Sequence, residues 1–193
     1  NKDVFEVQNE SEIIKVIFKD NSSIDCDYLI ISDGIFSKTK SLIAKKNIKP
    51  KYFNSVAIRA TIHQTDLYNI DHNNISLLLG SNLHSVVYPV DQNGQFNCVI
   101  ILRKTLNSQQ LSDYSLFNTK EFISSTLSEI SNQIDINIIE KLKNIKCFPL
   151  FVSTEIPQTK NKNIFIIGDA FFTFPPTFAQ GASQSIEVAH ELY

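Results

Sequence analysis

Two short acidic-glycine sequences are the parts of this chain whose residue types and positions could do chemistry. Asp33-Gly34 follows the apolar run 28–31, and Gly168-Asp169 follows the apolar run 163–167. Ligands of open α/β sheets bind beyond the carboxyl ends of the strands. There an Asp can accept hydrogen bonds from ribose hydroxyls, and a Gly lets the backbone approach a ligand. Each pair alone is also a common turn, whereas two of them on opposite sides of one inserted sheet favour a ligand site.

The segment after the second corner is rich in Phe and Pro over residues 170–179 and leads to a helix expected to begin near Gln180-Gly181. Pro175 and Pro176 fix φ and stiffen this loop, and its aromatic side chains would form an apolar wall. The free N–H groups and the positive dipole end of the helix would face the loop. Such a helix start stabilises negative charge on a bound group, although an ordinary loop before an ordinary helix explains the same residues.

The elements that must position these corners are of two kinds, buried strands near both ends of the chain and an antiparallel sheet between them. Apolar runs suited to strands buried on both faces lie near both ends. Asn93-Gly94 is a strong hairpin signal, because both central residues of that turn need positive φ. Strands that follow one another without a helix predict an antiparallel sheet in the middle of the chain, and the candidates are 56–63, 75–79, 85–90 and 96–102.

Helices are expected over residues 37–46, in two segments after the antiparallel strands, and at the C-terminal end. Asn118 with Glu121 three residues later resembles a capping box, and Asp135 is the expected cap of the next helix. Two apolar stripes at helical spacing are expected to be buried: Ile123, Leu127, Ile130 and Ile134 in one helix, and Ala182, Ile186, Ala189 and Tyr193 in the last.

Composition narrows the function classes. The formal net charge is -2 over 193 residues, so no global field recruits nucleic acid or an anionic membrane. Three scattered Cys and four His show no metal-ligand spacing, so we expect no metal, reduced thiols and a cytoplasmic location. The sequence has no apolar run of about 18 residues, so no membrane span is expected.

The order and spacing of the motifs resemble those of FAD-dependent aromatic hydroxylases related to para-hydroxybenzoate hydroxylase, a group that includes salicylate hydroxylases and ubiquinone-biosynthesis hydroxylases. The matching parts are 167–187, the stretch from Asp27 through Asp33-Gly34 to Lys40, and Tyr88-Pro89-Val90 with Asn97. The resemblance implies an α/β (mixed α+β) chain. Residues 1–52 and 151–193 would form part of a Rossmann-like FAD-binding domain, and 53–150 an inserted antiparallel-sheet substrate domain with two helices.

The resemblance also implies roles for individual residues. Asp169 would bind ribose-side hydroxyls of FAD, Pro175 would lie against the flavin, and Gly181 with Ala182 would present N–H groups to its pyrimidine edge. Asp33 would lie near the pyrophosphate and the path of NADH or NADPH. The full implied cofactor set is Asp33, Gly34, Gly168, Asp169, Pro175, Gly181 and Ala182.

In the family that this sequence resembles, reduced flavin reacts with O2, and the resulting hydroperoxide hydroxylates a small aromatic substrate. That substrate would lie between the flavin and the inserted sheet. Arg59, His63 and Tyr88 are the polar residues on the expected strands that could contact it. A buried polar residue with satisfied hydrogen bonds is the simpler explanation for each of the three.

The sequence departs from the family pattern in three places. Lys40 stands where the family usually has Arg, and Phe171-Phe172 stands where it often has Ala-His. The GxGxxG sequence that cradles the FAD pyrophosphate is missing, so we expect a fragment that is inactive in isolation. The alternatives are another flavoprotein of the superfamily, such as a halogenase or prenyl reductase, and a non-catalytic fragment that binds a partner. A homo-oligomer is also compatible with the sequence.

Overall fold

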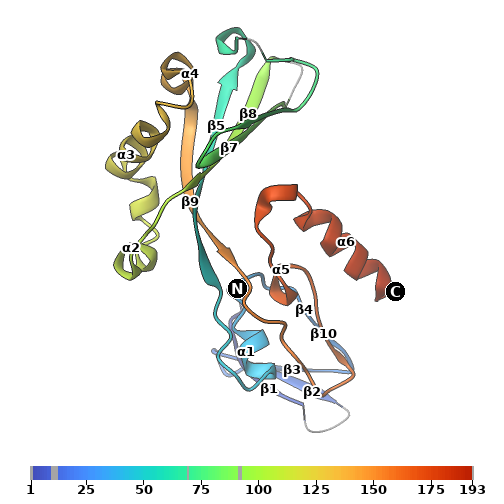
Figure 1. Ribbon diagram of the computed structural model, residues 1–193. Helices are drawn as coiled ribbons and strands as arrows, with labels where there is room; N and C mark the ends of the chain where they lie inside the picture. The colour runs from blue at the N-terminus through green and yellow to red at the C-terminus, as the bar shows by residue number, and fades with distance from the viewer. Residues whose placement is uncertain (1, 10–12, 69, 91–92, 193) are drawn as a thin grey trace. The chain divides into compact units, whose positions relative to one another are not determined.

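The computed structural model describes residues 2–9, 13–68, 70–90 and 93–192. The chain forms two compact units, one made of Asn1–Tyr52 with Phe151–Tyr193 and the other of Phe53–Leu150 (Figure 1). The chain therefore leaves the first unit, folds the second and returns to the first. Both units combine helices with sheets, which confirms the predicted mixed α/β class.

The first unit contains two small sheets. β1 (Val4–Gln8), β2 (Ile14–Phe18) and β3 (Ser23–Cys26) form an antiparallel sheet, while β4 (Leu29–Ile31) pairs in parallel with β10 (Ile164–Ile166). The parallel pairing of two segments far apart in the sequence confirms the interpretation of the two apolar runs. Strand β3 was not predicted, because its short sequence of Ser, Ile, Asp and Cys has no apolar pattern.

The parallel pair is buried on one face only, contrary to the prediction. Ile31 and Ile164 belong to a core with Ile14 and the other buried residues of this unit. On the other face Ile30 is 55% exposed. The expectation of two buried faces was wrong for β4 because the sheet has only two strands, and the described part of this unit covers one side of them.

The helices of the first unit are α1 (Thr39–Ile43), α5 (Gly168–Phe171), α6 (Gly181–Glu191) and the 3-10 turn η3 (Pro176–Phe178). Helix α1 is shorter than the predicted 37–46, because Lys45 adopts a positive φ of 49° and ends it. The short helix α5 was missed, since its Gly-Asp start has the composition of a turn.

Helix α6 begins where the sequence predicts it, but its apolar stripe is not buried. None of the described residues of α6 is buried, and Ile186 is 70% exposed. Tyr193, the last member of the predicted stripe, lies outside the described residues. Helical spacing identified the correct element here, but burial depends on what packs against it.

The second unit is built on a five-stranded sheet in the order β6-β7-β8-β5-β9. The strands are β5 (Lys51–His63), β6 (Ser76–Leu79), β7 (Leu83–Pro89), β8 (Gln95–Arg103) and β9 (Lys143–Val152). The antiparallel pairs β6–β7, β7–β8 and β8–β5 confirm the predicted strands.

Strand β9 was not predicted. It contains Pro149, two Lys residues and Asn144, which has a positive φ of 53°. These features resemble a loop, but β9 is an edge strand, and edge strands tolerate proline and charged side chains because one side of their backbone needs no partner.

Helices lie together on one side of this sheet (Figure 1). They are α2 (Ser108–Ser112), α3 (Lys120–Ile130) and α4 (Ile136–Lys141), and the unit also has 3-10 turns at Gln64–Asp66 and Leu116–Asn118.

The caps and buried face of these helices correct part of the prediction. Asp135 caps α4 as predicted, accepting from the Asn137 N–H at 2.9 Å. The cap of α3 is Thr119 rather than Asn118, and its hydroxyl accepts from the Phe122 N–H at 3.2 Å. The buried face of α3 comprises Phe122, Thr126 and Ile130, whereas Ile123, Leu127 and the later Ile134 are half-buried. Phe122 determines this face, because its ring packs edge-on against Phe117 at 5.1 Å.

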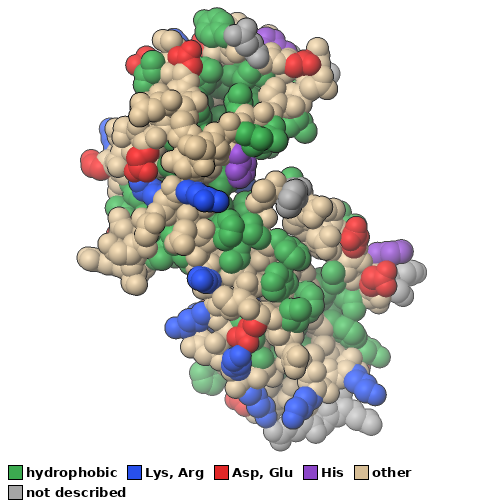
Figure 2. Space-filling view, in the orientation of Figure 1, with side chains coloured by type: hydrophobic (Ala, Val, Ile, Leu, Met, Phe, Trp, Pro, Cys, Tyr) green, Lys and Arg blue, Asp and Glu red, His purple; other side chains and the backbone are tan. Residues whose placement is uncertain are grey.

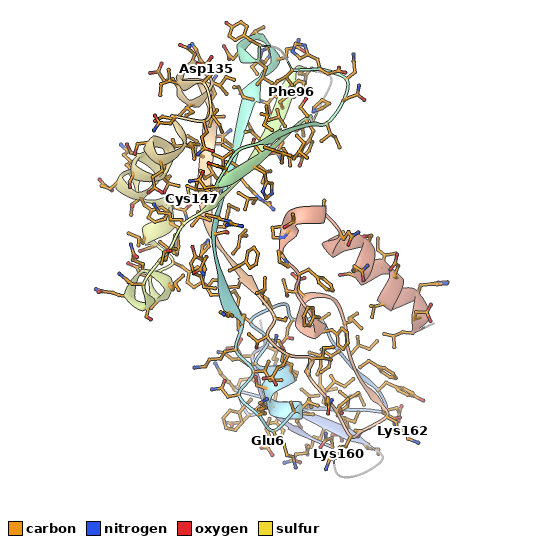
Figure 3. The ribbon with its side chains drawn as sticks, in the orientation of Figure 1. Glu6, Phe96, Asp135, Cys147, Lys160 and Lys162 are labelled. Atoms are coloured by element: carbon orange, nitrogen blue, oxygen red, sulfur yellow. The ribbon has the colours of Figure 1, made fainter. Side chains whose placement is uncertain are left out.

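Because Cys147 on β9 (Figure 3) is buried, we expect the protein to lose stability at alkaline pH. The residue is 1% exposed, and burial raises the pKa of its thiol from 9.0 to about 11. The unfolded chain therefore loses this proton first, so stability falls between pH 9 and about 11, by roughly 1–3 kcal/mol. Cys147→Ala should flatten this decline in urea unfolding measured at pH 8, 9, 10 and 11. Equal slopes for the two proteins would contradict the prediction.

Candidate functional site

The two acidic-glycine corners leave neighbouring strands at the same edge of a sheet. β4 and β10 are parallel, with Ile31 opposite Ile166. The Ile167 N–H continues the pairing by donating to the Ile31 carbonyl at 2.9 Å. Both corners therefore begin beyond the carboxyl ends of adjacent parallel strands, which is where ligands bind in open α/β sheets.

The first corner holds its carboxylate with a hydroxyl. Thr39 Oγ1 donates to Asp33 Oδ2 at 2.9 Å, and the Ser37 N–H donates to the Gly34 carbonyl at 3.0 Å. Gly34 has a φ of 83°, which favours glycine at the turn. Asp33 remains exposed and contributes to a groove that has both polar and apolar walls. Its lining residues are Lys2, Asp3, Val4, Leu29, Ile30, Ile31, Ser32, Asp33, Phe36, Ser37, Lys38 and Thr39.

The second corner opens into a small pocket against α6. Gly168 has a φ of 59°, and Asp169 is exposed in the first turn of α5. A Cβ at Gly168 would meet Ser185 Oγ at 3.3 Å, so α6 packs closely at this point. The pocket is lined by Gly168, Asp169, Phe171, Phe172, Phe174, Gly181, Gln184, Ser185 and Val188.

The Phe- and Pro-rich loop is tied to the end of β9. The Ser153 N–H donates to the Thr173 carbonyl at 3.0 Å, and the Thr173 N–H donates to Ser153 Oγ at 2.9 Å. The rings of Phe172 and Phe174 lie 5.0 Å apart. Hydrophobic side chains accordingly reach the surface of the first unit (Figure 2), where Phe174 is 49% exposed. The predicted apolar wall is present as an ordered loop.

Lys40 is a buried charge beside both corners. The residue is 2% exposed, and its Nζ donates to the Ile35 carbonyl at 2.8 Å. Burial lowers the pKa of Lys40, while the carboxylates of Asp33 and Asp169 act in the opposite direction and raise it. Its ammonium therefore interacts with both corners, a position that spacing along the sequence does not show.

Replacing Lys40 tests this interaction. We expect Lys40→Met to lower the free energy of unfolding by about 1–3 kcal/mol, because the Ile35 carbonyl loses its donor and two carboxylates lose a nearby cation. Lys38→Met, at an exposed neighbouring position, is the control and should stay within about 0.5 kcal/mol of the wild type. Urea unfolding at pH 7 measures both, and equal stabilities would show that Lys40 does not hold the corners.

The predicted cofactor residues are only partly brought together. Gly168, Asp169 and Gly181 share the pocket, and Asp33 lies in the groove. Gly34, Pro175 and Ala182 lie on the same loops and helix starts without lining either space. Gln184 and Ser185 were not predicted. Their positions three and four residues after Gly181 on one helix face could have identified them.

In the second unit the three predicted substrate residues lie on one face of the sheet. Alternate residues of β5 and β8, such as Ile58 and Phe96, are buried. The helices of this unit lie together on one side of the sheet (Figure 1), so we infer that the buried side chains face them. Arg59 and His63 alternate with these buried residues along β5, so they point to the opposite face of the sheet. The pairing of β7 with β8 places Tyr88 on that opposite face too. They therefore share the face without helices, which we call the open face.

Hydrogen bonds distinguish these residues. Both ring nitrogens of His63 are used inside the fold, with Thr65 Oγ1 at 2.9 Å and the Asn93 carbonyl at 3.2 Å. The Tyr88 hydroxyl accepts from Asn97 Nδ2 at 2.6 Å. Asn97 itself was not predicted as a contact residue, although its polar side chain between the apolar Phe96 and Cys98 is a usable signal.

The described ranges contain neither a metal-binding cluster nor a membrane-spanning helix. Residues 2–9, 13–68, 70–90 and 93–192 contain no group of three or more His, Cys, Asp or Glu that could hold a metal ion. In the same ranges no helix is long and apolar enough to cross a membrane.

Sequence comparison identifies the family. A family model described as an FAD binding domain matches residues 5–193. This chain belongs to the FAD-binding domain family. No curated protein sequence matches it.

Solved structures of two hydroxylases and of a protein in complex with FAD and uric acid share this fold at low identity. Salicylate hydroxylase in a substrate complex matches with a TM-score of 0.83 and 18% identity, over 100% of this chain and 51% of its own. The 2,6-dihydroxypyridine-3-hydroxylase from Arthrobacter nicotinovorans gives 0.80 and 16%, over 99% and 54%. Klebsiella pneumoniae HpxO with FAD and uric acid gives 0.73 and 17%, over 97% and 48%. The chain thus spans about half the length of these proteins.

Proposed function

We propose that this chain forms part of an FAD-dependent monooxygenase that hydroxylates an aromatic substrate with O2 and with NADH or NADPH as reductant. The main support is the pair of acidic-glycine corners on adjacent parallel strands, in a chain of the FAD-binding domain family. Proteins of the same fold include two hydroxylases and a protein solved with FAD and uric acid.

The residues of the second corner fit the cofactor. Asp169 is exposed and can accept from ribose hydroxyls with both carboxylate oxygens. A Cβ at Gly181 would meet no atom within 4 Å, so the start of α6 faces open space. The backbone N–H groups of Gly181 and Ala182 can therefore reach the negative edge of a bound ring, while Pro175 in the neighbouring loop would lie against it.

The first corner is proposed to serve the phosphates and the reductant. Thr39 orients the Asp33 carboxylate, and Gly34 leaves the backbone unobstructed, because a Cβ there would have nothing within 4 Å. Lys40 supplies a fixed positive charge nearby. As a compact ammonium it neutralises a charge without the planar fork of Arg.

When bound, FAD supplies the redox chemistry, and the chain supplies position and field. The proposed division of labour is that the first unit holds the cofactor and the second unit binds the substrate. All three Cys are free, which suits the cytoplasmic location that we propose.

The first experiment is the absorption spectrum of the purified full-length protein before and after addition of FAD and desalting. Flavin bands that persist, together with NADH or NADPH oxidation stimulated by phenolic compounds, are the expected result. A protein that retains no flavin would refute the proposed function. The corners would then be turns alone, and binding to a partner would become the leading function.

A further inference from the structure

Strand β6 lies at one edge of the five-stranded sheet and carries exposed apolar side chains. Within the described part of the chain, β6 pairs with β7 alone, so its other side has no partner strand there. Four consecutive aliphatic positions at this edge are between 43% and 77% exposed, namely Ile75, Leu77, Leu78 and Leu79. We call these four side chains the β6 strip.

This edge lacks the features that keep edge strands apart. Natural edge strands usually carry charged residues or Pro, which prevent pairing with another chain. Residues 73–83 contain no Asp, Glu, Lys, Arg, His or Pro. The opposite edge strand, β9, has Lys143, Lys146 and Pro149. The same sheet therefore protects one edge and leaves the other able to pair.

The backbone of β6 can accept another strand. The Gly80 N–H donates to the Leu83 carbonyl at 2.9 Å, so the backbone groups of Gly80 face β7. Hydrogen-bonded and non-bonded residues alternate along an antiparallel strand. The N–H and C=O groups of Leu77 and Leu79 therefore point away from β7, to the outside of the sheet, whereas those of Leu78 point toward β7.

A second copy of the same strand matches this geometry. If two copies meet antiparallel on a two-fold axis at Leu78, Leu77 of each copy lies opposite Leu79 of the other. Leu77 and Leu79 then form the hydrogen-bonded pairs, and Leu78 meets its own copy in a non-bonded pair, which is the alternation that the backbone requires. Leucine faces leucine throughout, and no like charges meet.

We propose that two copies of this chain associate through β6, in an antiparallel pair centred on Leu78 that joins their sheets. Because the same surface is used twice and β9 is protected, the contact closes as a dimer and does not continue as a filament. The dimer is independent of the proposed function, since the β6 strip lines neither the pocket nor the groove at the acidic-glycine corners.

The size of the β6 strip predicts a weak dimer. Four partly exposed aliphatic side chains present roughly 300 Å² of apolar surface per copy. Even with the backbone of both strands, the buried area stays below the roughly 1,200 Å² at which standard interfaces begin. We therefore expect a dissociation constant on the order of 10–100 μM.

The test is sedimentation velocity of the full-length protein from about 1 to 200 μM, a range that brackets the expected constant. The wild type should change from monomer to dimer as its concentration rises. Leu79→Lys places a charge at the edge in both copies and should weaken the dimer at least roughly tenfold. Its circular dichroism spectrum should match the wild type, because the Leu79 side chain is exposed.

The control is Ile136→Lys, the same kind of change at an exposed aliphatic residue at the start of α4 in the same unit. It should leave the dissociation constant of the dimer unchanged. A wild type that stays monomeric at the highest concentration, a dimer that Leu79→Lys does not weaken, or equal weakening by Ile136→Lys would each overturn the proposal.

A cysteine at the two-fold axis tests the register. Cα atoms of a non-bonded pair lie about 4.5 Å apart, within the range of a disulfide. Leu78→Cys should therefore link two copies when oxidised, whereas Leu79→Cys should not, because Leu77 of the other copy lies opposite it. Both changes are made in Cys26→Ser protein, since Cys26 is the native thiol that is not buried, and the Cys26→Ser parent is the control. Linkage through Leu79→Cys, or none through Leu78→Cys, would contradict the proposed pairing.

Discussion

Asp169→Ala is expected to lower the affinity for FAD roughly 100-fold without unfolding the protein. The carboxylate is exposed in the first turn of α5 and opens into the pocket shared with Gly181. Hydrogen bonds from hydroxyls to a charged group contribute about 1.5–3 kcal/mol each, less where solvent competes, so losing two gives about this factor. Titration of FAD into the flavin-free protein, followed by flavin fluorescence, measures the dissociation constant.

The matched control is Asp25→Ala, which removes an exposed carboxylate from β3 in the same unit. It should leave the dissociation constant unchanged. Asp169→Asn keeps one acceptor oxygen, so its affinity should lie between those of the wild type and Asp169→Ala. A dissociation constant unaffected by Asp169→Ala would remove this residue from the cofactor site.

Gly181→Ala is expected to weaken FAD binding roughly 30- to 100-fold while leaving the fold intact or slightly more stable. The added methyl group would meet no atom of the chain within 4 Å, and alanine favours a helix over glycine. The same methyl group would stand between the start of α6 and a ring bound to its N–H groups. Losing about two such hydrogen bonds gives an effect of this size.

Gly94→Ala serves as the control for Gly181→Ala, because it is expected to change the stability of the protein and not its affinity for FAD. Gly94 has a φ of 77°, and a Cβ there would lie 2.7 Å from the Gln64 side chain. This change should lower the free energy of unfolding by about 1–2 kcal/mol and leave FAD affinity unchanged. If Gly181→Ala bound FAD like the wild type, the start of α6 would have no contact with the cofactor.

Local patterns along the sequence were sufficient for part of this structure. The Asn93-Gly94 hairpin, the antiparallel strands beside it and the Asp135 cap depend on neighbours within a few residues, so propensity and spacing identify them. The motif order that led to the FAD-binding family is likewise a property of the sequence alone.

Interactions between distant segments explain where the structure differs from the predictions made from the sequence. Strand β9 was missed because only its edge position makes Pro149 and its Lys residues acceptable in a strand. The stripe of α6 was predicted to be buried although the described unit places nothing over Ile186. Periodicity shows which residues share a face of an element, whereas burial depends on what lies against that face.

The sequence alone determined that two acidic-glycine corners follow apolar runs and that Arg59 and Tyr88 lie on strands of an antiparallel sheet. Only the tertiary structure decided that the corners leave adjacent strands, because β4 and β10 pair across more than a hundred residues. It also buried Lys40, whose pKa the carboxylates of Asp33 and Asp169 raise against the effect of burial. The register of β5, β7 and β8 set Arg59 and Tyr88 on one open face. Backbone pairing over long separations depends on the whole chain, and no local propensity encodes it.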